Sequence, residues 1–223
     1  MLPTPAGSAH IDLNVPIAPV VPLAVALLGH GAGGGVDAPD VRAAGAALLA
    51  AGVAVGRFTQ PYRVAGRRAP APAAALDAAF LAGVGALRAR PGLGGVPLIA
   101  GGRSSGARVA CRTAERAGAV AVLALAFPLM PPGRPDRSRL PELLAVGRPT
   151  LVVQGSRDGF GGAGALTAAV GAAGPWPPWL RIAAVEGADH GFRARRADGR
   201  TSADCLAEIA AAVRDCVTWL SRG

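Results

Sequence analysis

The chain has 223 residues, of which 51% are hydrophobic, and this is enough for one domain with a sizeable core. Its formal net charge of +9 rests on arginine alone, because the sequence contains no lysine. The arginines are scattered, with short doublets at Arg67-Arg68 and Arg195-Arg196, whereas a nucleic-acid surface is expected to concentrate them in a patch or stripe. Solvated surface arginines are therefore favoured over a nucleic-acid partner.

The N-terminal segment has neither a basic start nor a continuous apolar stretch, unlike a signal peptide. The apolar run from Ile17 to Leu28 is interrupted by Pro19 and Pro22 and is too short to span a bilayer. The three cysteines show no metal-ligand spacing, so we expect buried free thiols in a reducing compartment. These features predict a soluble, cytoplasmic protein with no membrane partner.

Short apolar runs alternate with helical patterns along the chain. Residues 1–20 show a weak signal for an antiparallel hairpin. Nearly continuous apolar runs, typical of strands buried on both faces of a parallel sheet, follow at 23–28, 53–58, 96–100, 119–126, 150–154 and 181–185. Helical periodicity predicts helices at 38–51, 71–90, 106–117, 161–173 and 203–221. The alternation predicts an α/β fold: a doubly wound, mostly parallel sheet with helices on both faces, formed by residues 1–223 as a single domain.

The segment from Pro97 to Gly106 contains G-x-S-x-G directly after a predicted strand and directly before a predicted helix. This context is typical of a nucleophile elbow, although a purely structural turn is the alternative. The turn is so tight that the residues two before and two after the serine must be small, and Gly102 and Gly106 satisfy this. The turn also lifts the Ser104 hydroxyl clear of the sheet. Ser105 is the local rival, but only Ser104 has glycine at both offsets. The backbone N–H of Ser105 is better placed to bind an oxyanion.

A serine nucleophile needs a base, and the chain has three histidines. His190 lies before the last predicted helix, where a Ser, acid, His order along the chain would place the base. An exposed loop histidine is the alternative reading of His190. His30 is interpreted as a residue that shapes its loop, and His10 as a surface residue.

The acid of such a triad should follow the next-to-last strand, where Asp158 lies. A carboxylate there would accept the N–H of His190 and stabilise the imidazolium. Asp158 could instead be a turn residue, because Asp-Gly favours turns. Asp189 is the competing acid, but adjacent side chains usually diverge, which disfavours it as the partner of His190.

A glycine-rich loop, residues 28–35, follows the first confident strand. Glycines let the backbone approach a substrate, so we expect the N–H of Ala32, or of Gly31, to join that of Ser105 in an oxyanion hole. A phosphate-binding loop is the rival interpretation. It is disfavoured because the segment lacks the Walker lysine and does not match G-x-G-x-x-G.

Taken together, these segments resemble the dienelactone-hydrolase-like branch of the α/β hydrolases. The greatest similarity is to the group that contains the hydrolase-like domain of the NSL histone-acetyltransferase complex subunit. The matching motifs are HGAGG at 30–34, GGRSSGAR at 101–108, QGSRDGFG at 154–161 and DHGF at 189–192. The resemblance covers residue 20 to the C-terminus and implies the α/β-hydrolase fold with an eight-stranded, mostly parallel sheet. Dienelactone hydrolases proper use cysteine where this chain has Ser104, and Ala107 replaces a glycine common in the group.

The sequence therefore predicts a serine hydrolase of the esterase type. It would need no cofactor or metal and would act on a small-molecule acyl substrate. The insert Phe127–Leu140 occupies the place of a cap domain in larger relatives, and its shortness predicts a minimal cap or none, with an open site. A non-catalytic scaffold module is the alternative, but it predicts a decayed triad. A nucleic-acid-associated protein is a third possibility, motivated by the charge alone.

Overall fold

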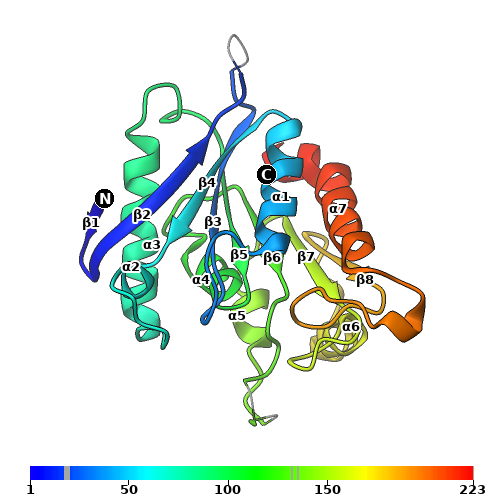
Figure 1. Cartoon of the computed structure of the whole chain (residues 1–223). Helices are drawn as coiled ribbons and strands as arrows, with labels where there is room; N and C mark the ends of the chain where they lie inside the picture. Colours follow the sequence, from blue (N-terminus) through cyan, green and yellow to red (C-terminus); the bar gives the residue numbers. More distant parts are fainter. Residues whose placement is uncertain (18–20, 132, 135, 223) are drawn as a thin grey trace.

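The computed structural model describes residues 1–17, 21–131, 133–134 and 136–222. Its centre is an eight-stranded sheet with the strand order β1-β2-β4-β3-β5-β6-β7-β8 (Figure 1). The strands are β1 (Leu2–Thr4), β2 (Gly7–Asn14), β3 (Ala24–Gly29), β4 (Val53–Thr59), β5 (Leu98–Arg103), β6 (Ala121–Leu125), β7 (Thr150–Gly155) and β8 (Leu180–Val185). Strands β3 to β8 are parallel, and the N-terminal pair β1 and β2 adds an antiparallel edge beside β4.

The central parallel strands are buried on both faces, which explains their nearly continuous apolar sequences, whereas the edge strand β8 is partly exposed. Every residue of β3, β6 and β7 is buried. The chain enters the parallel sheet at β3, adds β4 on one side and then crosses to β5 on the other. This crossover is where a doubly wound sheet opens a crevice beyond the strand ends. Gly29 at the end of β3 pairs with Gly102 of β5, so the glycine loop and the G-x-S-x-G turn are neighbours.

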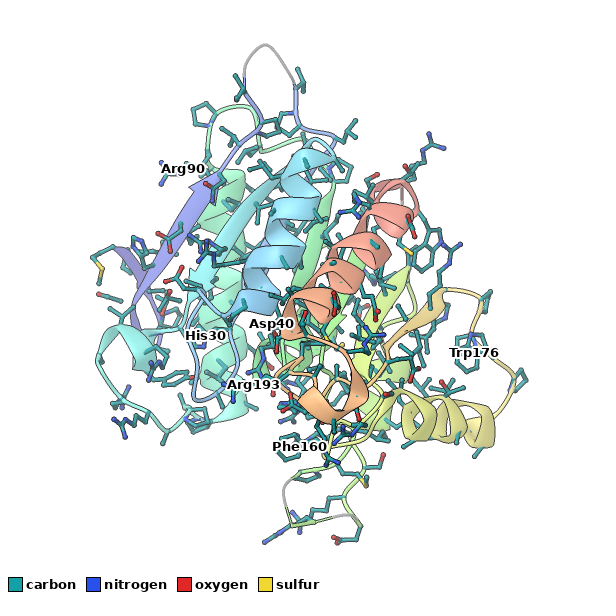
Figure 2. All side chains as sticks on the ribbon, turned by 45° about the vertical axis from the view of Figure 1, so that its right-hand side comes forward. His30, Asp40, Arg90, Phe160, Trp176 and Arg193 are labelled. Carbon is teal, nitrogen blue, oxygen red and sulfur yellow. The ribbon has the colours of Figure 1, made fainter. Side chains whose placement is uncertain are left out.

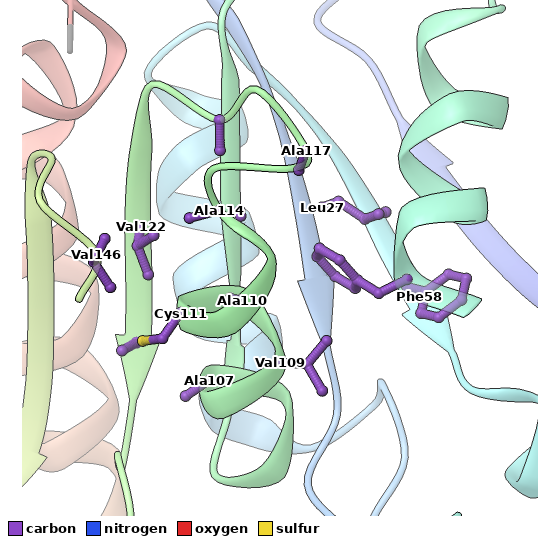
Figure 3. Packing of buried hydrophobic residues seen from close by; sticks show 14 of the residues in the cluster. Leu27, Phe58, Ala107, Val109, Ala110, Cys111, Ala114, Ala117, Val122 and Val146 are labelled. Carbon is purple, nitrogen blue, oxygen red and sulfur yellow. The ribbon is translucent and has the colours of Figure 1, made fainter. Parts of the chain in front are cut away.

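Helices cover both faces of the sheet and enclose two hydrophobic clusters (Figure 1). Helices α1 and α7 pack on one face, and α3, α4 and α6 on the other. Short side chains such as Ala107, Ala110 and Ala114 are almost fully buried and let α4 lie close to the sheet (Figure 3). The helices are α1 (Pro39–Ala50), α2 (Pro61–Val64), α3 (Ala73–Arg88), α4 (Ser105–Thr113), α5 (Leu140–Leu144), α6 (Ala163–Ala173) and α7 (Ser202–Arg222).

The structure differs from the sequence-based expectation mainly at short elements and element ends. Helices α2 and α5 were not predicted, because one turn of helix carries too little periodicity to recognise. The strand expected at 96–100 runs as β5 through Gly101 and Gly102, which the sequence suggested were already turn residues. The expected N-terminal hairpin forms as β1 and β2, and residues 18–20 at its predicted end lie outside the described residues.

All three cysteines are buried and free, as expected. None of the helices that the structure describes combines the length and apolarity needed to cross a bilayer.

Candidate active site

Ser104 lies at the turn between β5 and α4 in a strained backbone conformation. Its φ and ψ are 53° and −108°, and a positive φ is uncommon for any residue with a side chain. The turn is tied down at both sides, because Ser104 N donates to Leu125 O at 2.8 Å and Arg108 N donates to Ser104 O at 3.2 Å. The neighbouring β6 and the first turn of α4 therefore hold the strained serine in place.

Gly102 and Gly106 have no room for a side chain. A Cβ atom on Gly106 would lie 2.5 Å from Gly29 O and 2.9 Å from His30 O. A Cβ atom on Gly102 would lie 2.6 Å from Gly29 O and 2.8 Å from the carbonyl carbon of Gly106. The sequence suggested a collision across the turn itself, and the structure adds the end of β3 as a second wall.

The structure brings together Ser104, His190 and Asp158. His190 Nε2 lies 2.9 Å from Ser104 Oγ, and His190 Nδ1 lies 2.7 Å from Asp158 Oδ2. With a carboxylate on Nδ1, the ring carries its proton there and leaves Nε2 free to accept the serine hydroxyl. This is the arrangement in which an imidazole can remove the hydroxyl proton.

Asp158 is held as a buried acceptor, whereas the rival acid Asp189 is used elsewhere. The Asp158 side chain is 0% exposed, and it also accepts from Gln154 Nε2 at 3.0 Å and Phe160 N at 2.8 Å. Asp189 Oδ1 instead accepts the backbone N–H groups of Gly191 at 2.8 Å and Arg193 at 2.9 Å. Of the two acids, Asp158 is the one bonded to the His190 ring.

His30 is buried within the protein and has no contact with Ser104 among the described hydrogen bonds. Its Nδ1 bonds to Gly31 O at 2.8 Å, and its Nε2 accepts from Gln60 N at 3.0 Å. Burial lowers the pKa of His30, against the opposing effect of the Gly31 carbonyl. His30 therefore stays neutral and ties the glycine loop to the segment after β4. Tyr62 adds a second tie, because its hydroxyl donates to Ala32 O at 2.7 Å.

The expected oxyanion-hole residues lie next to Ser104. Ala32 and Ser105 line the same pocket as the serine. Ser105 begins α4, so its N–H belongs to the first helical turn, where backbone donors lack a partner within the helix. A Cβ atom on Gly31 would lie 3.6 Å from Ser104 Cβ, so Gly31 also lies next to the serine. Both Ala32 and Gly31 remain candidates for the second donor.

A pocket of about 340 Å³ opens at Ser104. Its wall includes Ala32 and Gly33 of the glycine loop together with Phe160 and His190. Figure 2 shows His30, Asp40, Arg193 and Phe160 at the same end of the sheet, away from Arg90. This is the end that the strand order predicts for chemistry.

The cationic side chains in the pocket wall are arginines, and the described wall contains no carboxylate. Arg103 pairs with Asp40, and Arg108 binds Glu142 through two bonds of 2.5 and 2.8 Å. The insert 127–140 contributes only Pro128 and Arg139, from its two ends, and its residues 132 and 135 lie outside the described residues. Within the described ranges, His, Cys, Asp and Glu side chains form no group of three that could bind a metal.

Sequence reasoning missed three residues that support the site. Gln154 Nε2 bonds to Phe127 O, Asp158 Oδ2 and Gly161 O, at 3.2, 3.0 and 2.7 Å. The Phe160 ring meets the His190 ring edge-on, with 4.4 Å between centroids. Arg103 bonds to the His190 carbonyl. All three lie within the motifs at 101–108 and 154–161, but nothing in those motifs indicates which groups they contact.

Residues 22–218 match the profile of a family described as the α/β-hydrolase domain. That match covers most of the chain. The chain belongs to the α/β-hydrolase family. Its eight-stranded, mostly parallel sheet confirms the fold expected from the motifs.

Solved structures of other α/β hydrolases share this fold. A serine hydrolase without a lid from Xanthomonas campestris superposes with a TM-score of 0.70 at 22% identity, covering 96% of this chain and 92% of that one. The dienelactone hydrolase of Anabaena variabilis gives 0.68 at 20% identity, covering 95% and 91%. Esterase 2 of Thermogutta terrifontis, solved after phosphonylation by cyclosarin, gives 0.68 at 17% identity, covering 95% and 89%. A search of curated protein sequences found no match.

Proposed function

We propose that this α/β hydrolase is a serine hydrolase that cleaves an ester or related acyl bond through a covalent acyl-enzyme. One observation carries the proposal: the chain of hydrogen bonds from Ser104 through His190 to the buried Asp158, which opens onto a pocket. A nucleophile, a base and a group that orients the base are the parts that acyl transfer needs.

In the proposed reaction, Ser104 Oγ attacks the carbonyl carbon while His190 Nε2 takes the hydroxyl proton. The N–H groups of Ser105 and of Ala32 or Gly31 stabilise the oxyanion, and Asp158 stabilises the imidazolium. His190 then returns the proton to the leaving oxygen, which departs as an alcohol and leaves the acyl-enzyme. Water attacks this ester with His190 again as base, and Ser104 is regenerated as the carboxylic acid leaves.

The size of the pocket limits the proposed substrate. A volume of about 340 Å³ lies at the small end of the range for ligand pockets. With only Pro128 and Arg139 from the short insert in its wall, the pocket suits small or medium acyl groups or an ester exposed on a larger molecule. No cofactor takes part in the proposed steps.

The experiment that tests this function is reaction with a fluorophosphonate probe, followed by peptide mapping. We expect modification at Ser104 and none in a Ser104→Ala variant. The Thermogutta esterase, which reacts with a phosphonylating agent, is a precedent in the same fold. Modification at Ser105 would contradict the assignment of the nucleophile. An unmodified but well-folded protein would favour the scaffold alternative.

We also propose a narrower group for this chain within the α/β hydrolases. The motifs at 30–34, 101–108, 154–161 and 189–192 support a place in the dienelactone-hydrolase-like branch, with the group that contains the NSL subunit domain. Serine in place of the cysteine of dienelactone hydrolases proper supports an ordinary esterase mechanism here. We further propose that residues 1–223 fold as one domain, because the single sheet draws strands from both halves of the chain.

A further inference from the structure

Arg103, the residue directly before Ser104, forms an ion pair with Asp40 and a hydrogen bond with the His190 carbonyl, two groups from distant parts of the chain. Its Nε lies 2.8 Å from Asp40 Oδ2, and its Nη2 donates to the backbone carbonyl of His190 at 2.9 Å. The side chains of Arg103 and Asp40 are 18% and 3% exposed. The bond to the His190 carbonyl is separate from the bonds that the His190 ring makes.

The same guanidinium packs against the glycine loop. A Cβ atom on Gly31 would lie 2.7 Å from Arg103 Nη1. Asp40 stands in the first turn of α1, only a few residues after that loop. Arg103 therefore joins the three segments that supply the nucleophile, the base and the second oxyanion donor.

The His190 segment is a loop whose main chain is also tied to the segment after β7, where Arg157 N donates to Ala188 O at 3.0 Å. It follows β8, and between Val185 and Ser202 the described regular structure is one short 3₁₀ turn, Arg196–Asp198. Asp158 holds the His190 ring through Nδ1, but that bond does not restrain the main chain of the loop. Reacting groups must be held to well within 1 Å, so an anchor on the main chain matters for rate.

We propose that Arg103, oriented by Asp40, is a positioning residue that fixes the His190 main chain and the glycine loop relative to Ser104. This inference rests on the proposed hydrolase function. The planar fork of arginine suits the task, because Nε forms the ion pair with Asp40 while Nη2 donates a hydrogen bond to the His190 carbonyl. A lysine ammonium is a single point charge and cannot contact both Asp40 and the His190 carbonyl as the guanidinium does.

Two other roles for Arg103 make different kinetic predictions. If the ion pair only fastens α1 to the sheet, its loss lowers the melting temperature and leaves kcat unchanged. If Arg103 binds substrate directly from the pocket wall, its loss raises KM. A positioning role lowers kcat with little change in KM, because the misplaced groups act in the transition state.

The test is Arg103→Lys, with Arg112→Lys as the matched control. The Arg112 side chain is also 18% exposed and lies outside the pocket wall. It binds Asp77 through two bonds of 2.6 and 2.9 Å and makes a longer bond of 3.3 Å to Glu142, the partner of Arg108. On p-nitrophenyl acetate we expect Arg103→Lys to lower kcat by about 100-fold, with KM changed by less than about 3-fold. Arg112→Lys should leave kcat unchanged. Equal kcat values for the two variants would overturn the proposal.

A second measurement follows the His190 ring without any substrate. The proton between His190 Nδ1 and Asp158 should give a low-field NMR resonance in the wild type and in Arg112→Lys. We expect Arg103→Lys to broaden or lose it, because a mobile loop exposes the bond to solvent exchange. An unchanged resonance in Arg103→Lys contradicts this inference, whereas a wild type that no fluorophosphonate labels contradicts the proposed function.

Should Arg103→Lys fail to fold by circular dichroism, Asp40→Asn decides the question. It keeps the size of the side chain and leaves the bond from Arg103 to His190 possible, but removes the charge that orients the guanidinium. We expect a loss of kcat smaller than that of Arg103→Lys and a partly broadened resonance. Wild-type kcat and an unchanged resonance in Asp40→Asn would then overturn the proposal.

Discussion

Two histidines of this chain follow parallel strands at the same edge of the sheet, and they do different things. His30 follows β3, is 2% exposed and bonds to backbone groups through both ring nitrogens. His190 follows β8, with a side chain that is 20% exposed, and its ring lies between a carboxylate and a serine hydroxyl at the pocket. His30 and His190 are therefore the same residue type at the same kind of place in the fold.

The two rings differ in their partners at both nitrogens, and the Nε2 partner decides whether a ring can act as a base. With Nδ1 on a carbonyl in His30 and on a carboxylate in His190, both rings carry their proton on Nδ1 and accept through Nε2. The donor to His30 is the amide of Gln60, which does not give up its proton. The donor to His190 is the hydroxyl of Ser104, which can give up its proton. A histidine in a loop beyond a strand is thus a candidate base only when its Nε2 partner is a group that can react.

Removal of the His190 ring should reduce turnover more than any other change considered for the two histidines. His190→Ala should lower kcat for p-nitrophenyl acetate by a factor on the order of 10⁴ to 10⁶, because the hydroxyl of Ser104 loses its only described base. The melting temperature should change little, since the ring is partly exposed. A variant that keeps most of its turnover would show that another group activates Ser104.

The next effect concerns the carboxylate that distinguishes the two sites. Asp158→Asn should lower kcat by about 10⁴-fold, the size known for the equivalent change in a protease triad, because an amide cannot stabilise the imidazolium. Asp189→Asn should be mild, because Asp189 bonds to backbone N–H groups and not to the ring. Circular dichroism of both variants checks folding. The reverse order of effects would make Asp189 the acid.

The loops that carry His30 and His190 both meet the nucleophile elbow. One added methyl group at this turn should destabilise the fold. Gly106→Ala should destabilise the fold by about 1–3 kcal/mol, because the new Cβ would overlap the backbone of Gly29 and His30. Gly85→Ala is the matched control, since Gly85 lies in α3 with open space around it and alanine there should stabilise by about 0.5–1 kcal/mol. Chemical denaturation measures both values. Equal stabilities would mean that the elbow is looser than the distances imply.

The contrast between the histidines also shows how far sequence reasoning reaches. The sequence was enough to select Ser104, Asp158 and His190. Each follows a strand that its apolar run makes easy to recognise, and G-x-S-x-G is a local pattern. The ion pair between Arg103 and Asp40 could not be predicted, since it joins the end of β5 to the start of α1, which become neighbours only through the order of strands in the sheet. Gln154 and Phe160 were missed for the same reason, because their roles depend on which loops meet. Local patterns indicate elements and turns, whereas the neighbours of a side chain depend on topology.

Protonation of His30 should have a small effect on the pH dependence of stability. The pKa of His30 is lowered by burial, so His30 is neutral in the folded protein and binds a proton more readily in the unfolded chain. The stability that this contributes is fully present above the unfolded pKa of about 6.5 and is lost as pH falls below it. One proton changes the free energy of unfolding by at most about 1.4 kcal/mol for each pH unit. His30→Gln, whose amide oxygen can still accept from Gln60 N, should therefore flatten the fall in stability between pH 7.5 and 5.5. Urea denaturation of the wild type and the variant at several pH values measures the two slopes, and parallel slopes would show that His30 takes up its proton equally in the folded and unfolded states.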